Sequence, residues 1–326
     1  MPPQLNHENR AASPPAGQDT QGPHPEQQDG AHPCHTVPAP PQAPLTRSNR
    51  AAKATITIAT LNINGFTAPS HNMTGIEKWS TIYRTMTDQK IAILAVQETH
   101  LDEDLLNRVT QCYGKRLTLI TSFDPDSPRA SAGVAFVINK RLIQPNKITV
   151  FELYEGRALA LKIKWHDTED TAILNIYAPN SRAAQPEFWR KIKARKQLCR
   201  LRNPDFMVGD FNVTEDTIDR SPPHPDEQNA ITAIRETRHQ WGLHDAWRHA
   251  YPNQKIFTYR AISNDQPIKS RLDRIYTTSN IAQQSFNWQH NASPVPTDHW
   301  LVSVKFAPCD APYIGNGRWT WDVSSL

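Results

Sequence analysis

Residues 205–212 read AspPheMetValGlyAspPheAsn, a short apolar run that ends in polar residues on either side of Phe211. A run of this kind is typical of a buried strand whose end carries side chains into a loop. Because successive strand residues point to opposite faces, Asp210 and Asn212 share one face while Phe211 enters the core. The stretch therefore predicts a strand with a polar site at its end.

Three other short segments repeat this arrangement at the edges of apolar runs. They are GlnGluThrHis at 97–100, ArgLeuAspArg at 271–274 and ThrAspHis at 297–299. Carboxylates that gather at one rim repel one another, so they usually need a hard divalent cation between them. Together the four segments predict a metal-dependent hydrolase.

Strand patterns alternate with amphipathic helical patterns between residues 54 and 308. Strands are predicted at 55–61, 91–96, 117–123, 132–138, 148–153, 158–165, 171–177, 205–208, 256–259, 272–277 and 301–306, and helices at 75–90, 102–112, 185–201 and 228–241. Hairpin-rich strands with a few long helices favour an α+β sandwich with its helices outside. In such folds the loops at one rim carry the chemistry.

The first 53 residues differ in composition from the rest of the chain. Pro, Gln, His and Ala dominate there, and no Phe, Trp or Tyr occurs before Phe66. A tract of this composition cannot bury a core. We expect a disordered leader over 1–53, one domain over 54–308 and a C-terminal tail over 309–326.

Charge, cysteines and hydropathy narrow the class of protein. A net charge of +4 is compatible with a polyanionic partner such as DNA but does not by itself indicate one. The four cysteines form no CysXxxXxxCys pair, so neither a zinc cluster nor a disulfide framework is indicated. No apolar run approaches the roughly 20 residues of a membrane helix. We expect a soluble, intracellular protein with no membrane partner, and a chromosomal target would place it in the nucleus.

Six motifs occur in the order seen in the endonuclease/exonuclease/phosphatase superfamily. They are LeuAsnIleAsnGly at 61–65, GlnGluThr at 97–99, TyrAlaProAsn at 177–180, GlyAspPheAsn at 209–212, ArgLeuAspArg at 271–274 and ThrAspHis at 297–299. The chain resembles this superfamily, and its GlnGluThrHisLeu, IleTyrAlaProAsn and IleAspArgSerProPro segments are most similar to the endonuclease domain of LINE-type (non-LTR) retrotransposons, a relative of apurinic/apyrimidinic endonucleases. The resemblance implies a DNase I-like, four-layer α/β/β/α sandwich of two mostly antiparallel sheets.

The resemblance also implies a metal site. It makes Glu98, which follows the predicted buried strand 91–96, the principal Mg²⁺ ligand, with Mn²⁺ as a substitute. It places Asn62 beside the metal and Asp298 close to it. Asn64 lies two residues after Asn62 and is either a substrate contact or a turn residue before Gly65.

The same resemblance assigns the catalytic groups. Asp210 activates the attacking water or protonates the leaving oxygen, and Asn212 hydrogen-bonds the phosphate. Asp273 orients His299, which contacts the phosphate or the water. Tyr177 directs its phenol at the phosphate, as a donor or as phenolate, unless it is a half-buried core residue.

Three further residues are candidates for substrate binding. Asn180 would hold the loop after the strand 171–177, and Arg157, which opens a strand near the rim, would contact a phosphate. Asp219 lies where relatives hold a second substrate-contacting aspartate, and a role outside the site is its equal alternative.

The predicted function is Mg²⁺-dependent hydrolysis of a phosphodiester by in-line attack of water, as in a DNA-nicking endonuclease of retrotransposon type. No Ser or Cys stands in the paired context that a covalent intermediate requires. Two alternatives stay open. One is a phosphatase or phospholipid phosphodiesterase on the same scaffold, and the other is a transposon-derived remnant that binds nucleic acid without cutting it.

Overall fold

The structure is a computed structural model that describes residues 54–65, 75–144, 148–164, 170–263, 265–308 and 311. The expected leader at 1–53 lies outside the described residues, as does the expected tail at 309–326 apart from Ala311. Both therefore stay predictions. Among the described residues, no helix has the length and apolar character needed to cross a membrane.

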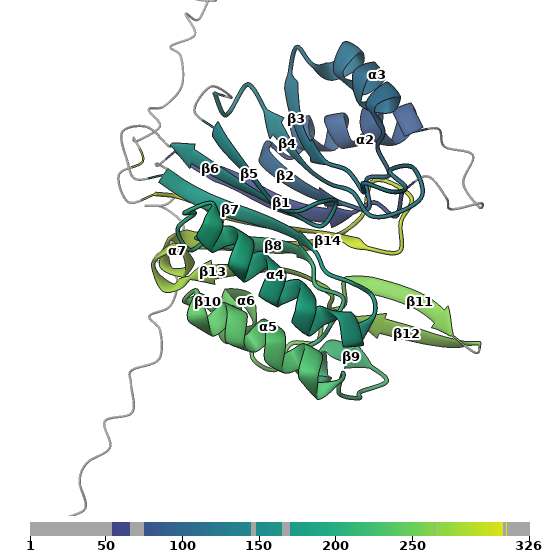
Figure 1. Cartoon of the computed structure of the whole chain (residues 1–326), viewed down its shortest axis with the longest axis vertical. Helices are drawn as coiled ribbons and strands as arrows, with labels where there is room; N and C mark the ends of the chain where they lie inside the picture. The colour runs from purple at the N-terminus through teal and green to yellow at the C-terminus, as the bar shows by residue number, and fades with distance from the viewer. Residues whose placement is uncertain are drawn as a thin grey trace, which may run out of the picture. The chain divides into compact units, whose positions relative to one another are not determined.

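Two six-stranded sheets form the centre of the domain (Figure 1). In spatial order, the first sheet contains β14 (Ser285–Ala292), β15 (Trp300–Phe306), β1 (Ile56–Asn62), β2 (Ile91–Gln97), β4 (Val134–Asn139) and β3 (Leu117–Ser122). The second contains β10 (Leu243–His244), β13 (Asp273–Thr278), β8 (Phe206–Asp210), β7 (Asp170–Tyr177), β6 (Ala158–Lys164) and β5 (Ile148–Tyr154). A third, three-stranded sheet contains β11 (Tyr259–Ser263), β12 (Gln266–Ser270) and β9 (Arg220–Ser221).

Helices cover the outer faces of the two large sheets. Figure 1 shows α2 (Gly75–Asp88) and α3 (Glu103–Tyr113) beside the first sheet, and α4 (Gln185–Leu198) and α5 (Gln228–Gln240) beside the second. Two short helices, α6 (Ala246–Ala250) and α7 (Ser279–Gln284), lie before and after the segment that contains β11 to β13. The structure confirms the predicted α+β sandwich with outer helices.

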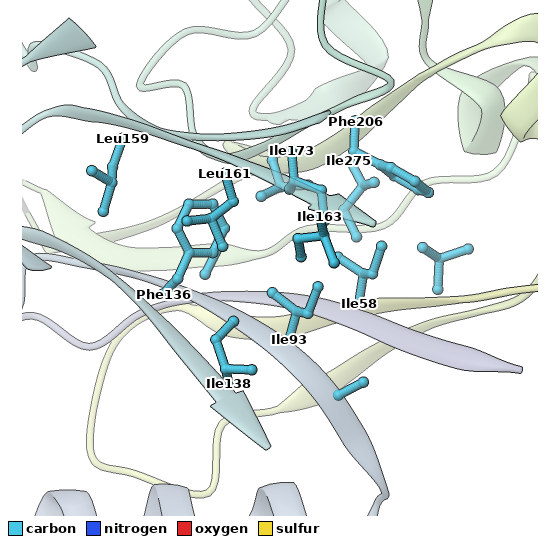
Figure 2. Close-up of a cluster of buried hydrophobic side chains, with 14 of the residues drawn as sticks. Ile58, Ile93, Phe136, Ile138, Leu159, Leu161, Ile163, Ile173, Phe206 and Ile275 are labelled. Carbon is cyan, nitrogen blue, oxygen red and sulfur yellow. The ribbon is translucent and has the colours of Figure 1, made fainter. Parts of the chain in front are cut away.

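Side-chain alternation along the strands builds one core between the two sheets and another on the outer face of each sheet. Between the sheets, Ile58, Ile93 and Phe136 of the first sheet meet Leu161 and Phe206 of the second (Figure 2). The alternate residues of the same strands face outward. Leu61 and Leu94 pack with Trp79 and Ile82 of α2, while Met207 packs with Trp189 of α4 and Ile234 of α5.

A buried polar link joins the two sheets within this apolar core. Gln97, the last residue of β2, donates from Nε2 to Asn175 Oδ1 of β7 over 2.6 Å and to Thr60 Oγ1 of β1 over 3.0 Å. Asn175 donates in turn to the carbonyl oxygens of Val96 and Ala135. Satisfied polar groups of this kind fix one arrangement of the sheets, directly before Glu98 in the chain.

Several predicted elements differ from those observed. The predicted strand at 256–259 is wrong, because β11 begins only at Tyr259 and the Thr258 hydroxyl accepts a hydrogen bond from the Asp273 backbone N–H instead. The strands β9, β10, β12 and β14 and the short helices α6 and α7 were not predicted. Paired neighbours in the described sheets are antiparallel except for β1 with β2 and β7 with β8, so the expectation of mostly antiparallel sheets is confirmed.

Candidate active site

Strand register brings the polar segments to one rim. Asn62 of β1 pairs with Gln97 of β2, so Glu98 follows directly beside it. In the other sheet, Asp210 of β8 pairs with Tyr177 of β7 on one side and with Asp273 of β13 on the other. Parallel neighbours end at the same edge, so their terminal side chains converge without any loop folding back.

Left-handed backbone positions mark the points where these strands end. Glu98, Asn64 and Asn212 have φ values of 49°, 47° and 49°. Residues with side chains rarely adopt this region, and it concentrates at functional sites. Gly209 also has a positive φ, and a Cβ there would lie 1.9 Å from the Ile176 carbonyl oxygen, so the approach of β8 to β7 before Asp210 requires glycine.

Asn62 lies between two of the carboxylates. Its Nδ2 donates to Glu98 Oε1 and to Asp210 Oδ2, each over 2.9 Å, while its Oδ1 accepts from the Asn64 backbone N–H over 2.9 Å. The amide oxygen has a second lone pair, so the predicted position of Asn62 beside the metal stays a prediction. Asn62 acts in this arrangement as a donor that holds two negative groups at a fixed separation.

Asp210 is a buried carboxylate whose one cationic partner among the described residues is an imidazole. It is 1% exposed, and its Oδ1 accepts from the Asn212 backbone N–H over 2.9 Å. Burial, together with the charge of Asp273, raises the pKa of Asp210 to about 6, although His299 and Asn62 act in the opposite direction. A carboxyl group in this range can exchange a proton near neutral pH.

His299 is held by Asp273 and faces two further carboxylates. Its Nδ1 lies 2.8 Å from Asp273 Oδ2, and its Nε2 lies 3.9 Å from both Asp210 Oδ2 and Asp298 Oδ1. Burial acts to lower the pKa of His299, but Asp273 and the other carboxylates outweigh it and raise the pKa to about 10. The imidazole is therefore a cation at neutral pH, oriented by Asp273.

Tyr177, Asn180 and Asn212 form a hydrogen-bonded group on the β7 side of the rim. Asn212 Nδ2 donates to Asn180 Oδ1 over 2.7 Å and to the Ala178 carbonyl oxygen over 2.9 Å. The Tyr177 hydroxyl lies 3.4 Å from Asn180 Oδ1. Burial and the Glu98 charge raise the pKa of Tyr177, so the phenol keeps its proton and is a donor rather than a phenolate. The Asn212 amide hydrogens are used in these two hydrogen bonds. The amide hydrogens of the exposed Asn180 have no protein partner among the described residues.

The remaining predicted residues border this group, with one exception. Asn64 Nδ2 donates to Asp298 Oδ1 over 3.2 Å, and the Arg157 guanidinium lies over the Tyr177 ring at 4.9 Å. Asp219 is not brought to the group, because it is fully buried against Arg271 and Arg248. Its arginine partners give Asp219 a structural role. Of the two roles that the sequence left open, its position fits the one outside the site.

Two sets of side chains offer ligand atoms for a metal. The ligand atoms of Asp210, Asp273 and His299 lie within 4.8 Å of one another. Asp273 Oδ2 and His299 Nδ1, however, already form a hydrogen bond with each other. Glu98 accepts hydrogen bonds from Asn62 and Tyr177, and Asp298 accepts one from Asn64, with 19% and 33% of their side chains exposed. A carboxylate oxygen that accepts a hydrogen bond has a further lone pair for a cation. Oxygen donors of this kind fit Mg²⁺ and Mn²⁺.

Two residues at the rim were not identified from the sequence. Lys78 of α2 is buried, and its ammonium donates to the carbonyl oxygens of Ile63 (2.9 Å) and Gly65, which holds the segment that carries Asn64. Its position on the apolar face of the predicted helix 75–90 could have identified Lys78 from the sequence as a buried lysine. The Tyr259 ring lies 4.9 Å from the His299 ring, and no sequence pattern distinguished this tyrosine from a strand residue.

The fold has similar counterparts among solved structures. The endonuclease domain of TRAS1, a telomere-specific non-LTR retrotransposon, matches 78% of this chain and all of its own length, with a TM-score of 0.56 and 13% identity. The AP endonuclease LMAP from Leishmania major matches 82% of this chain and 92% of its own, with a TM-score of 0.64 and 16% identity. The 3′ phosphatase NExo from Neisseria, solved with a product DNA hairpin, matches 78% of this chain and all of its own, with a TM-score of 0.58 and 18% identity.

A curated relative and a family model extend the comparison to sequence. The "Transposon TX1 uncharacterized 149 kDa protein" of Xenopus laevis is 26% identical over 164 residues, which are half of this chain and 12% of that protein. The model of the Endonuclease/Exonuclease/phosphatase family matches residues 59–299, a range that contains the rim residues from Asn62 to His299. The chain therefore belongs to the Endonuclease/Exonuclease/phosphatase family.

Proposed function

We propose that this protein is a Mg²⁺-dependent endonuclease that nicks DNA by in-line attack of water on a phosphodiester. The observation that carries the proposal is the group of buried or half-buried carboxylates around His299, none of which has an arginine partner among the described residues. Unneutralised carboxylates beside an imidazolium match a negatively charged ester that arrives with a divalent cation. The non-LTR retrotransposon endonuclease and the transposon protein among the relatives support DNA as the substrate.

Glu98 and Asp298 would hold the metal, with Asn64 beside Asp298. Mg²⁺ bound there would supply a positive charge that lowers the cost of the charge developing on the phosphate. Lys78 fixes the backbone at Ile63 and Gly65, and Asn62 fixes Glu98, so the ligands are held before the cation binds. A preorganised ligand set of this kind does not have to be assembled at the moment of reaction.

Asp210 and His299 divide the remaining chemistry. The Asp210 carboxylate takes a proton from the attacking water, which its raised pKa allows at neutral pH. The His299 imidazolium, held by Asp273, offers Nε2–H to a phosphate oxygen and stabilises the charge that accumulates there. Tyr177 and Asn180 are neutral donors on the opposite side of the rim.

Plasmid nicking tests the proposal. Supercoiled plasmid should become open-circular with the wild-type protein and Mg²⁺ or Mn²⁺, and should stay supercoiled with EDTA or with Glu98→Gln. Glu187→Gln is the matched control, since Glu187 lies on the exposed surface of α4 in a pair with Arg190. Metal-independent nicking, or full nicking by Glu98→Gln, contradicts the assignment of the metal site.

A phosphatase activity is the second candidate, because a 3′ phosphatase shares the fold. A duplex with a 3′-phosphate at a nick distinguishes the two. Release of inorganic phosphate without chain cleavage favours the phosphatase, whereas cleavage of an intact duplex favours the endonuclease. Binding of DNA with neither reaction indicates the catalytically idle remnant. Action on chromosomal DNA would place the protein in the nucleus.

A further inference from the structure

Arg260 is an exposed arginine that differs in its surroundings from the buried arginines of the domain. Its guanidinium lies over the Trp300 ring, with Cζ 4.7 Å from the ring centroid. Buried arginines such as Arg271 pair with carboxylates. Within the described part of the chain, no carboxylate lies within ion-pair distance of Arg260. Its charge and its N–H groups are therefore available to an anion from outside the protein.

Backbone pairing places Arg260 beside the catalytic group. The Arg260 backbone N–H donates to the Asp298 carbonyl oxygen over 3.1 Å, and Trp300 N–H donates to the Thr258 carbonyl oxygen over 2.7 Å. Between them, Tyr259 and His299 form an antiparallel bridge. Alternation along the paired segments puts Arg260 and Asp298 on one face and Tyr259 and His299 on the other. Asp298 links the two, because its Oδ1 lies 3.9 Å from His299 Nε2.

A second arginine lies over an aromatic ring at the second six-stranded sheet. Arg157, before β6, stacks on Tyr177 at 4.9 Å and also has no carboxylate within ion-pair distance among the described residues. An aromatic ring orients a guanidinium without neutralising its charge, whereas a carboxylate orients the guanidinium and also neutralises its charge. The rim thus has two oriented, unneutralised cations, one from each side of the group that contains His299.

We propose that Arg260, held on Trp300, binds a backbone phosphate next to the scissile phosphodiester. With Arg157 on the other side, the enzyme then requires a substrate with phosphates flanking the reacting group, which is a polynucleotide rather than an isolated phosphate ester. This inference rests on the proposed function and names the part of the substrate that lies outside the reacting group. Trp300 is a positioning residue, because it acts through Arg260.

The salt dependence of DNA binding tests this contact. Fluorescence anisotropy with a labelled duplex in EDTA measures binding without cleavage. Each neutralised phosphate contributes about 0.9 to the slope of log Kd against log salt, so Arg260→Gln should reduce the slope by about 0.9. Loss of one charge-assisted contact should also weaken binding about tenfold at low salt. Arg260→Lys should keep the slope, because it keeps the charge, but should bind less tightly than the wild type.

Arg195→Gln is the matched control, since Arg195 is exposed on α4 and also has no carboxylate within ion-pair distance among the described residues. It should leave both the slope and Kd at wild-type values. Equal slopes for Arg260→Gln and Arg195→Gln overturn the inference, as does an absence of DNA binding by the wild-type protein. Unchanged circular dichroism and melting temperature establish that the variants fold.

A pair of substrates separates this inference from the proposed function. The ratio of plasmid nicking to hydrolysis of bis(p-nitrophenyl) phosphate, a diester without flanking phosphates, should fall about tenfold in Arg260→Gln and stay constant in Arg195→Gln. A wild-type protein that binds DNA but cuts neither substrate disproves the endonuclease, and the salt slope then still decides the Arg260 contact. A ratio that does not change in Arg260→Gln overturns the Arg260 contact and leaves the endonuclease standing.

Discussion

Asp210 and Asp219 are both buried aspartates, yet their neighbours give them opposite properties. Asp219 accepts hydrogen bonds from Arg271 over 2.9 and 2.8 Å and also contacts Arg248. Asp210 has the neutral amide of Asn62, a backbone N–H and a hydrogen-bonded imidazole nearby. The comparison teaches that a buried carboxylate is structural where arginines bind it directly, and available for chemistry where its hydrogen bonds come from neutral donors and the nearest cation is an imidazolium.

The pKa values of the two regions follow the same division. Burial acts to raise the pKa of Asp245, but Arg271 outweighs it and the pKa is lowered. Burial also raises the pKa of Asp210, and there no guanidinium opposes it, so the pKa reaches about 6. Burial therefore acts in the same direction on both carboxyl groups, and Arg271 reverses the shift of Asp245.

Asp210→Asn tests the reactive side of the comparison. The amide cannot take a proton from water, so we expect Mg²⁺-dependent nicking to fall about 10³-fold, within the range for loss of a general base. Circular dichroism should show a folded protein. Initial rates of plasmid nicking measure the effect, and a loss of less than tenfold would remove Asp210 from the proton transfer.

Asp219→Asn tests the structural side. It leaves the buried guanidiniums of Arg271 and Arg248 without their shared carboxylate, so we expect the free energy of unfolding to fall by about 3 kcal/mol. Urea denaturation measures this. Glu187→Gln, which breaks the exposed pair with Arg190, should leave the urea midpoint unchanged. If both variants unfold at the same urea concentration, the division between the two regions fails.

The sandwich could be predicted because its central strands carry a local signal. Runs such as Ile91–Gln97 and Val134–Asn139 are apolar up to their last residue, which identifies strands that are covered on both faces. The strand β14 was missed because Ser285–Ala292 lies at a sheet edge, where polar residues alternate with Phe286 and Trp288. The helices α6 and α7 are too short for a helical period to appear.

Most of the candidate site could be predicted because its residues end strands, and strand ends are visible in the sequence. The role of Asp219 could not be predicted, because its partners Arg248 and Arg271 lie 29 and 52 residues away in the sequence and meet it only in the folded chain. The direction of the Asn62 amide also depends on contacts to Glu98 and Asp210 that no local pattern contains. Motifs therefore located the groups, and the non-local partners determined what each group does.

Asp273→Asn sharpens the comparison through the imidazole. Without the Asp273 charge, burial lowers the pKa of His299 from about 10, so the ring loses its proton as the pH rises through the neutral range. We expect nicking to fall about 10²-fold at pH 8 and less at pH 6, where more of the ring stays protonated. The pH–rate profile measures this difference. An equal loss at both pH values would mean that Asp273 does not act through the charge of His299.

Substitution of His290 has the smallest predicted effect. Whereas the pKa of His299 is raised, that of His290 is lowered. Its ring packs on Trp247 at 4.9 Å, and burial together with the charge of Arg271 lowers its pKa to about 4. The unfolded chain protonates this histidine near its ordinary value of 6.5, and the folded chain only near 4, so stability falls as the pH drops through that window. His290→Gln should therefore recover about 1 kcal/mol of unfolding free energy at pH 5 relative to pH 7, measured by urea denaturation. If His290→Gln and the wild type lose stability equally between pH 7 and pH 5, burial and Arg271 do not hold His290 neutral.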